Sequence, residues 1–205
     1  MNRALAFTML LTTTYGGGAA PAAGMQAGDS AAGAVYRALL SDQRCSKRGI
    51  RPDHDELVVG LETAASLNSM LLRGEPRETT ARFLTAQMPE FDVAIVDRFL
   101  AANATPRRLD GRAMGALGAT VITRRNLDRV FQQKPTDPWG AFDNRYPRAT
   151  GFIELGVPAF SPDGSHAIAY CSNTWGLVGG DGYVAFLEWR DNNWIIVKLQ
   201  LLWQS

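Results

Sequence analysis

The sequence predicts an α+β fold in which N-terminal helices pack on a C-terminal four-stranded antiparallel meander. Apolar residues recur at helical spacing through much of residues 30–132, whereas residues 152–203 show strand-like alternation interrupted by turn sequences. The last predicted strand carries Lys198 and Gln200 on one face, which indicates a sheet with one fully covered face. The N-terminal helices are the available cover for the other face.

The N-terminus has the three-part pattern of a secretory signal peptide. Arg3 supplies a positive charge, residues 4–11 are apolar, and Ala20 and Ala22 offer small residues for cleavage. We therefore expect residues 1–24 to be a signal peptide, with cleavage between Ala20 and Ser30. Residues 25–205 then form one domain, with a mainly helical part at 25–135 and a short helix plus sheet at 136–205. The predicted location is the bacterial periplasm or the secreted fraction.

The charge balance excludes a strongly basic nucleic-acid-binding protein. The chain has 21 basic and 20 acidic residues, and loss of Arg3 with the leader leaves 20 of each. Nucleic-acid binding leaves a basic footprint, and none is visible here. No later segment is apolar enough to cross a membrane, so we expect no membrane insertion after cleavage. We expect no cofactor.

The N-terminal part predicts several helices. Ser30 is placed to cap a helix that buries Val35, Tyr36, Leu39 and Leu40. Leu57 to Leu72 is apolar but does not distinguish helix from strand. The remaining expected elements are an extended piece at Lys47–Pro52, helices at Thr79–Gln87, Pro89–Asn103, Leu127–Gln132 (capped by Asn126) and Trp139–Tyr146, and a strand at Thr120–Thr123.

The C-terminal part predicts four strands, at Phe152–Phe160, His166–Ser172, Tyr183–Trp189 and Trp194–Trp203. Pro158 marks the first as an edge or bulged strand. Residues 161–164 and 191–193 are expected turns, and residues 173–182 an expected Gly-rich loop. On the fourth strand, a period of two places five apolar residues on one face: Ile195, Val197, Leu199, Leu201 and Trp203.

The chain resembles a family of exported bacterial proteins with no assigned activity, over nearly its whole predicted mature length. The residues that carry the resemblance are Tyr36, Phe99, Asn103, Trp139, Phe142, Tyr146, Pro147, Gly151, Phe160, Ala167, Gly176, Gly180, Gly182, Trp194, Trp203 and Ser205. The chain departs from the pattern at Pro158-Ala159, where the family tends to have Val-Gly, and at Val178, where it often has Cys. The resemblance implies no catalytic residues.

The two cysteines, Cys45 and Cys171, suit a disulfide because their number is even and the chain carries an export signal. The alternative is two separate buried thiols, since Cys171 lies in an alternating apolar strand. A catalytic pair of Cys171 with His166 is disfavoured, because an odd separation on one strand puts them on opposite faces. A pair of Cys45 with His166 or His54 stays open.

Other groups of reactive residues are weaker candidates. Asp53-His54-Asp55-Glu56 has metal-binding residue types, but contiguous residues point apart, so we predict an exposed turn and no metal site. Ser161, Ser165 and Ser172 lie near His166 and Asp163 in the sequence without a Gly-x-Ser-x-Gly elbow. Glu154 and Glu188 leave paired-carboxylate chemistry open.

The Gly-rich loop is the most suggestive surface feature. We predict a ligand or partner contact there, at Asn173, Trp175, Leu177 and Asp181, together with the neighbourhood of Tyr146. The alternative is that Trp175 folds back onto the core. Trp139, Tyr146 and Trp194 lie at junctions between elements, where large aromatic residues join one layer to another.

The expected function is a non-enzymatic binding or interaction module for a protein or small ligand. The alternatives are a hydrolase of cell-envelope material or secreted polymers, and an immunity-type inhibitor.

Overall fold

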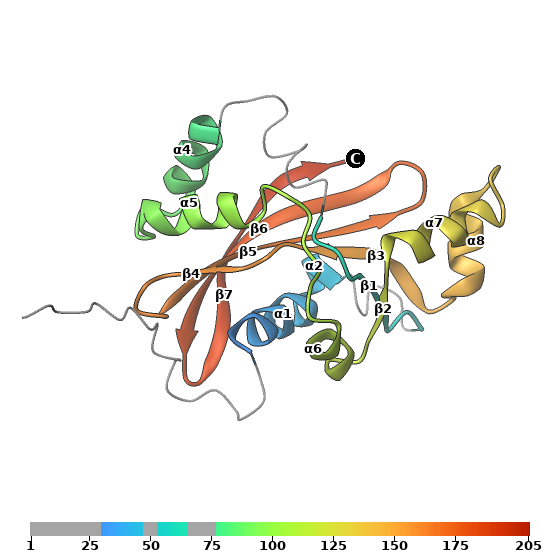
Figure 1. Cartoon of the computed structure of the whole chain (residues 1–205), viewed down its shortest axis with the longest axis horizontal. Coiled ribbons are helices and arrows are strands. Elements are labelled where there is room, and N and C mark those ends of the chain that lie inside the picture. The colour runs from blue at the N-terminus through green and yellow to red at the C-terminus, as the bar shows by residue number, and fades with distance from the viewer. Residues whose placement is uncertain (1–29, 47–52, 65–76) are drawn as a thin grey trace, which may run out of the picture.

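A computed structural model of the chain describes residues 30–46, 53–64 and 77–205, which form a mixed seven-stranded sheet with helices on both faces (Figure 1). The predicted signal peptide, the extended piece at 47–52 and the segment 65–72 lie outside the described residues. The helices are α1 (Ala31–Ser41), α2 (Gln43–Ser46), α4 (Arg77–Gln87), α5 (Val93–Ala102), α6 (Gly111–Ala116), α7 (Arg124–Gln132) and α8 (Pro138–Arg145). The strands are β1 (Glu56–Gly60), β2 (Ala119–Ile122), β3 (Ala149–Leu155), β4 (Ala159–Phe160), β5 (His166–Trp175), β6 (Gly179–Arg190) and β7 (Asn193–Gln204).

The α+β class is confirmed, but the four-stranded antiparallel meander is wrong. The strand order is β2-β1-β3-β5-β6-β7, with β4 also pairing with β5, and β1 runs parallel to both β2 and β3. The reason lies in β1, whose residues 57–60 are all buried. A short apolar strand in the sheet interior lacks the alternation that identifies half-exposed strands.

The predicted strand Phe152–Phe160 is two strands, β3 and β4. Pro158 lies between them and has no N–H for the sheet. The buried Asn103 side chain bridges this break, because its Nδ2 donates to Val157 O and its Oδ1 accepts from Val157 N, at 2.9 and 2.8 Å. Asn103 also ends α5, as predicted.

The starts of α5 and α7 differ from the prediction, because in each a better-placed side chain caps the helix. Asp92 accepts from Ala94 N at 2.9 Å, so α5 begins at Val93 and not at Pro89. Thr123 accepts from Asn126 N at 3.1 Å, so α7 begins at Arg124. Ser30 caps α1 as expected, accepting from Gly33 N at 3.1 Å. Among the described residues, no helix is long and apolar enough to span a membrane.

Side chains of β5 alternate between two apolar clusters on opposite faces of the sheet. Ala167, Ala169 and Cys171 belong to the cluster under α1, whereas Ile168 and Tyr170 belong to the cluster under α4 and α5. A third cluster, under α7 and α8, contains the aromatic residues Phe131, Trp139, Phe142 and Tyr146. Trp194, 6% exposed, packs edge to face against Trp189 in the first cluster.

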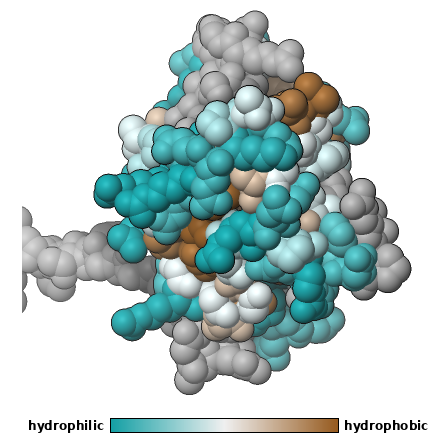
Figure 2. Space-filling model, turned by 90° about the vertical axis from the view of Figure 1, so that its right-hand side faces the viewer, coloured by the Kyte–Doolittle hydropathy of each residue, from teal (hydrophilic) through white to brown (hydrophobic). Residues whose placement is uncertain are grey.

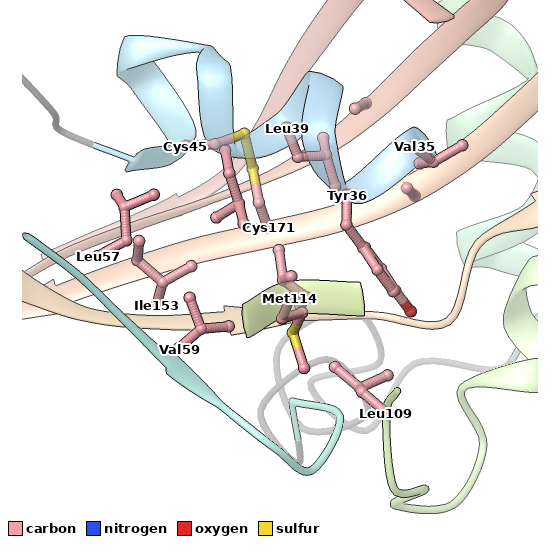
Figure 3. Close-up of a cluster of buried hydrophobic side chains, with 14 of the residues drawn as sticks. Val35, Tyr36, Leu39, Cys45, Leu57, Val59, Leu109, Met114, Ile153 and Cys171 are labelled. Carbon is pink, nitrogen blue, oxygen red and sulfur yellow. A yellow bond between two sulfur atoms is a disulfide. The ribbon is translucent and has the colours of Figure 1, made fainter. Parts of the chain in front are cut away.

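A disulfide between Cys45 and Cys171 joins α2 to β5 across 126 residues, as one of the two alternatives predicted (Figure 3). Both cysteines are buried and bonded to each other, so the alternative of two separate thiols is wrong and neither sulfur is free to act as a nucleophile. Figure 3 shows Leu39 of α1 beside the bond and Tyr36 farther along the helix, with Leu57 and Ile153 on neighbouring strands. The disulfide therefore fixes α2 within the first cluster.

The fourth strand does not place its five apolar residues on one face. The pairing of β7 with β6 shifts register between Gly182 and Tyr183 and again between Phe186 and Leu187. These bulges leave Val197 and Leu202 without a partner on β6, and both pack on the α4/α5 side, whereas Leu199 packs on the α1 side. A single unpaired residue reverses the alternation, which a strict period of two cannot anticipate.

Candidate functional site

The free end of the β5–β6 hairpin is the candidate site. The predicted ten-residue loop is wrong, because both strands continue through it to a turn at residues 176–178. In Figure 1 the turn lies toward the right, where α7 and α8 reach farther out, and this side of the molecule faces the viewer in Figure 2, with hydrophobic surface confined to small areas. Leu177 and Val178 are 78% and 80% exposed, whereas the other exposed large hydrophobic side chains described are 42–51% exposed.

The base of the hairpin end is polar and buried. Asn173 and Asp181 are direct partners across β5 and β6, and are 0% and 2% exposed. Asn173 Nδ2 donates to Ser46 O at 3.3 Å, which ties β5 to the end of α2. Tyr183 Oη donates to Asp181 Oδ2 at 3.3 Å. Burial, and then the Asp181 carboxylate, raise the pKa of Tyr183, so its hydroxyl stays a donor.

Glycines in these strands make room for the polar base. A β-carbon at Gly151 would overlap the Asn173 side-chain oxygen and Thr174 O, so β3 can carry only glycine at this point. On the opposite face, Trp203 lies across Gly180 and Gly182, and its Nε1 donates to Tyr170 Oη at 2.9 Å. Three of the four glycines that suggested a loop, Gly179, Gly180 and Gly182, are strand residues under large side chains, and only Gly176 lies in the turn.

The α2 side of the hairpin base is held by Asp42. Its Oδ1 accepts from Arg44 N at 2.8 Å, and its Oδ2 pairs with Arg44 Nη2 at 2.9 Å. Burial acts to raise the pKa of Asp42, but the hydrogen bonds from the side chain and backbone of Arg44 outweigh it and lower the pKa. Ser46 Oγ donates to Asp42 O at 2.9 Å. The short helix and its disulfide therefore form a fixed support for β5.

Four of the five predicted contact residues lie together on this hairpin. Asn173 and Asp181 form its base, Leu177 its turn, and Trp175 lies half-buried, with its indole against Gly179. Tyr146 belongs instead to the third cluster, where its ring centroid lies 5.1 Å from that of Phe142 and 5.8 Å from the Arg145 guanidinium carbon. The contact role of these residues stays a prediction.

The serine, aspartate and histidine residues of the β4–β5 turn do come together. Ser165 Oγ donates to Asp163 Oδ2 at 2.7 Å and lies 2.9 Å from His166 Nδ1. Because the carboxylate is the stronger acceptor for the one hydroxyl proton, His166 donates to Ser165 and does not accept from it. Hydrogen bonds from Ser161 and then Ser165 hold the pKa of Asp163 well below its usual range. The group stabilises a tight turn, in which Gly164 has a φ of 71°.

The two strand glutamates are too far apart to act as a catalytic pair. Glu154 lies opposite Ser172, and Glu188 lies opposite His166, six residues away along β5. Six residues span about 20 Å of strand. Paired carboxylates in glycoside hydrolases are about 5–9.5 Å apart.

Residues of the acidic segment 53–56 form polar contacts with neighbouring side chains. Asp55 pairs with Arg148, and Glu56 Oε1 accepts from Thr120 Oγ1 at 3.0 Å. In the described parts of the chain, no group of three or more His, Cys, Asp or Glu side chains could hold a metal ion.

The sequence did not point to Val178, Tyr183 or Ser46 as parts of this site, and it grouped Ser172 with the serines of the β4–β5 turn. Val178 carries the clearest signal, since two adjacent apolar residues stand between glycines in a turn. Ser172 is fully buried, and within the described residues its Oγ has no hydrogen-bond partner. Nothing in the sequence distinguishes this serine from a surface serine.

Comparison with protein-family models, with curated proteins and with solved structures finds no match to this chain.

Proposed function

We propose that this chain is an exported binding module that contacts a protein partner through the turn of the β5–β6 hairpin. The observation that carries the proposal is the exposure of Leu177 and Val178, 78% and 80%, on a hairpin whose base is buried. Two adjacent apolar side chains in water cost free energy that contact with a partner would recover.

The support of the hairpin favours a binding role over a merely mobile turn. Asn173 ties β5 to α2, and the disulfide at Cys171 lies four residues before Trp175. A surface held rigid before contact loses less conformational entropy on binding, so its affinity is higher. The same disulfide supports the predicted periplasmic or secreted location, since such bonds persist in oxidising compartments.

The test is site-specific photo-crosslinking in the native cells, with a photoreactive residue at position 177. The matched control carries the residue at Asn192, in the turn at the opposite end of β6, which is also exposed. We expect a discrete adduct of higher mass from position 177 only. Equal adducts from both positions, or none from either, would contradict the proposal.

A further inference from the structure

The outer edge of β7 is a second surface built for contact. β7 forms one end of the sheet, and no described strand pairs with its outer edge. It is twelve residues long, whereas β2 at the opposite end has four. Short edge strands resist pairing with other chains, and long apolar ones invite it.

The composition of β7 adds to this difference. None of its large apolar residues after Trp194 is buried, and Ile195 and Leu201 are 45% and 42% exposed. These residues are Ile195, Ile196, Val197, Leu199, Leu201, Leu202 and Trp203. Its one charge is drawn inward, because Lys198 Nζ donates to Gln87 O at 2.6 Å. A charged lysine directed outward is a common protection of edge strands, and β7 lacks it.

The alternation of β7 side chains between the two faces of the sheet limits how a second copy of β7 could pair with it. With the bulge residues Val197 and Leu202 set aside, the other residues alternate regularly between the two faces, following their partners on β6. Residues that face each other across an antiparallel pair lie on the same side of the sheet. Only a limited set of two-fold registers therefore joins β7 to a second copy of itself.

One register pairs apolar with apolar and polar with polar residues between Ile195 and Trp203. With the two-fold axis at Leu199, that residue faces itself, Ile196 faces Leu201, and Ile195 faces Trp203, while Lys198 faces Gln200. Moving the axis to Lys198 would place two ammonium groups opposite each other. Moving it to Gln200 would place Lys198 opposite Trp203. Like charges directly opposite are destabilising, and apolar cross-strand pairs are stabilising.

We propose that two copies of this chain pair through β7, antiparallel about Leu199, so that one sheet continues across both copies. Such a contact is two-fold symmetric and self-complementary, so each copy supplies the same surface. It leaves the turn of the β5–β6 hairpin outside the interface, and it does not depend on the function proposed for that turn.

Sedimentation of the purified protein over a range of concentrations tests the association. We expect a dimer in the wild type, and a monomer in the Ile195→Lys/Leu201→Lys variant, whose far-UV circular dichroism should match that of the wild type because both side chains are exposed. Leu177→Lys/Val178→Lys adds the same charges at the hairpin turn and should remain dimeric. A wild type that is monomeric at every concentration would overturn the proposal, as would a double variant at β7 that stays dimeric.

A single cysteine tests the register. Facing residues in an antiparallel pair have Cα atoms about 4.5–5.5 Å apart, within reach of a disulfide. Leu199→Cys should therefore form a covalent dimer on mild oxidation, since Cys45 and Cys171 are already bonded to each other. Ile195→Cys, at a more exposed position that faces Trp203, should stay monomeric on a non-reducing gel. Equal cross-linking of the two variants would show random collision and overturn the register.

Discussion

The two ends of β6 carry turns of opposite character. At one end, Asp191 and Asn192 have positive φ angles of 49° and 61°, which suit a two-residue hairpin. At the other end, Gly176 alone has a positive φ, of 67°, and the exposed residues that follow it are Leu177 and Val178. The first turn has the residue types that its backbone requires, whereas the second has apolar side chains that its backbone does not require.

This difference separates residues that hold the fold from residues that the fold does not explain. Asn and Asp tolerate the left-handed conformation better than other non-glycine residues, so Asp191 and Asn192 are accounted for by local structure. Leu177 and Val178 bury almost nothing and cap no element. Their presence at a well-supported turn is the reason to assign them to contact.

Of the changes that test this difference between the two turns, removal of the disulfide should lower the free energy of unfolding most. In Cys45→Ala/Cys171→Ala, loss of a link across 126 residues should lower the free energy of unfolding by about 4–5 kcal/mol, on a chain-entropy estimate. Denaturant unfolding of the variant and the wild type measures this difference in free energy. Hydrogen exchange should rise at Asn173 before it rises at the Asp191–Asn192 turn. A loss below about 1 kcal/mol would show that α2 holds β5 without the bond.

Gly182→Ala should cause the second largest loss in the free energy of unfolding. A β-carbon there would overlap Trp203 Nε1 and Tyr170 Oη, so the indole must move and its hydrogen bond is lost. We expect a loss of about 2–3 kcal/mol in the free energy of unfolding, the upper range for overpacking. Gly115→Ala is the matched control, because nothing lies within 4 Å of its β-carbon in α6. The control should be neutral or stabilising by up to about 1 kcal/mol.

In the Asp191–Asn192 turn, the effect of a substitution on stability should depend on whether the new residue tolerates a positive φ angle. Asn192→Ala places a β-carbon at a φ of 61° and should cost about 1 kcal/mol in thermal or chemical unfolding. Asn192→Gly keeps the conformation accessible and should be nearly neutral or slightly stabilising. If both variants were equally destabilised, the Asn192 side chain would hold the turn by a contact, and the conformational explanation would be wrong.

Sequence patterns predicted the parts of this fold that depend on local chemistry. The Ser30 cap, the end of α5 at Asn103 and the turn around Gly164 each follow from the conformational preferences of one or two residues. Disulfide pairing of Cys45 with Cys171 was one of two alternatives, because only the fold brings α2 beside β5.

The errors came from features set by distant residues. The glycines at 179, 180 and 182 suggested a flexible loop, but they are strand residues covered by Trp175 and Trp203. β1 pairs in parallel with both β2 and β3. The local sequence ELVVG determines neither these neighbours nor their direction. The predicted loop at residues 173–182 was wrong for the same reason, and the contact role of its residues stays a prediction.

The smallest expected effect on stability is also the sharpest test of the comparison. Leu177→Ser/Val178→Ser removes two apolar side chains that are about four-fifths exposed. The free energy of unfolding should therefore change by no more than about 0.5 kcal/mol. The same variant should lose the adduct formed by a photoreactive residue placed near the turn at Ser205, which is exposed and pairs with Gly180 through the backbone. A matched double change at the other turn, Asp191→Ser/Asn192→Ser, should lower stability measurably and leave the adduct intact. The opposite pattern, in which the apolar turn controls stability and the polar turn controls the adduct, would reverse the roles assigned to the two ends of β6.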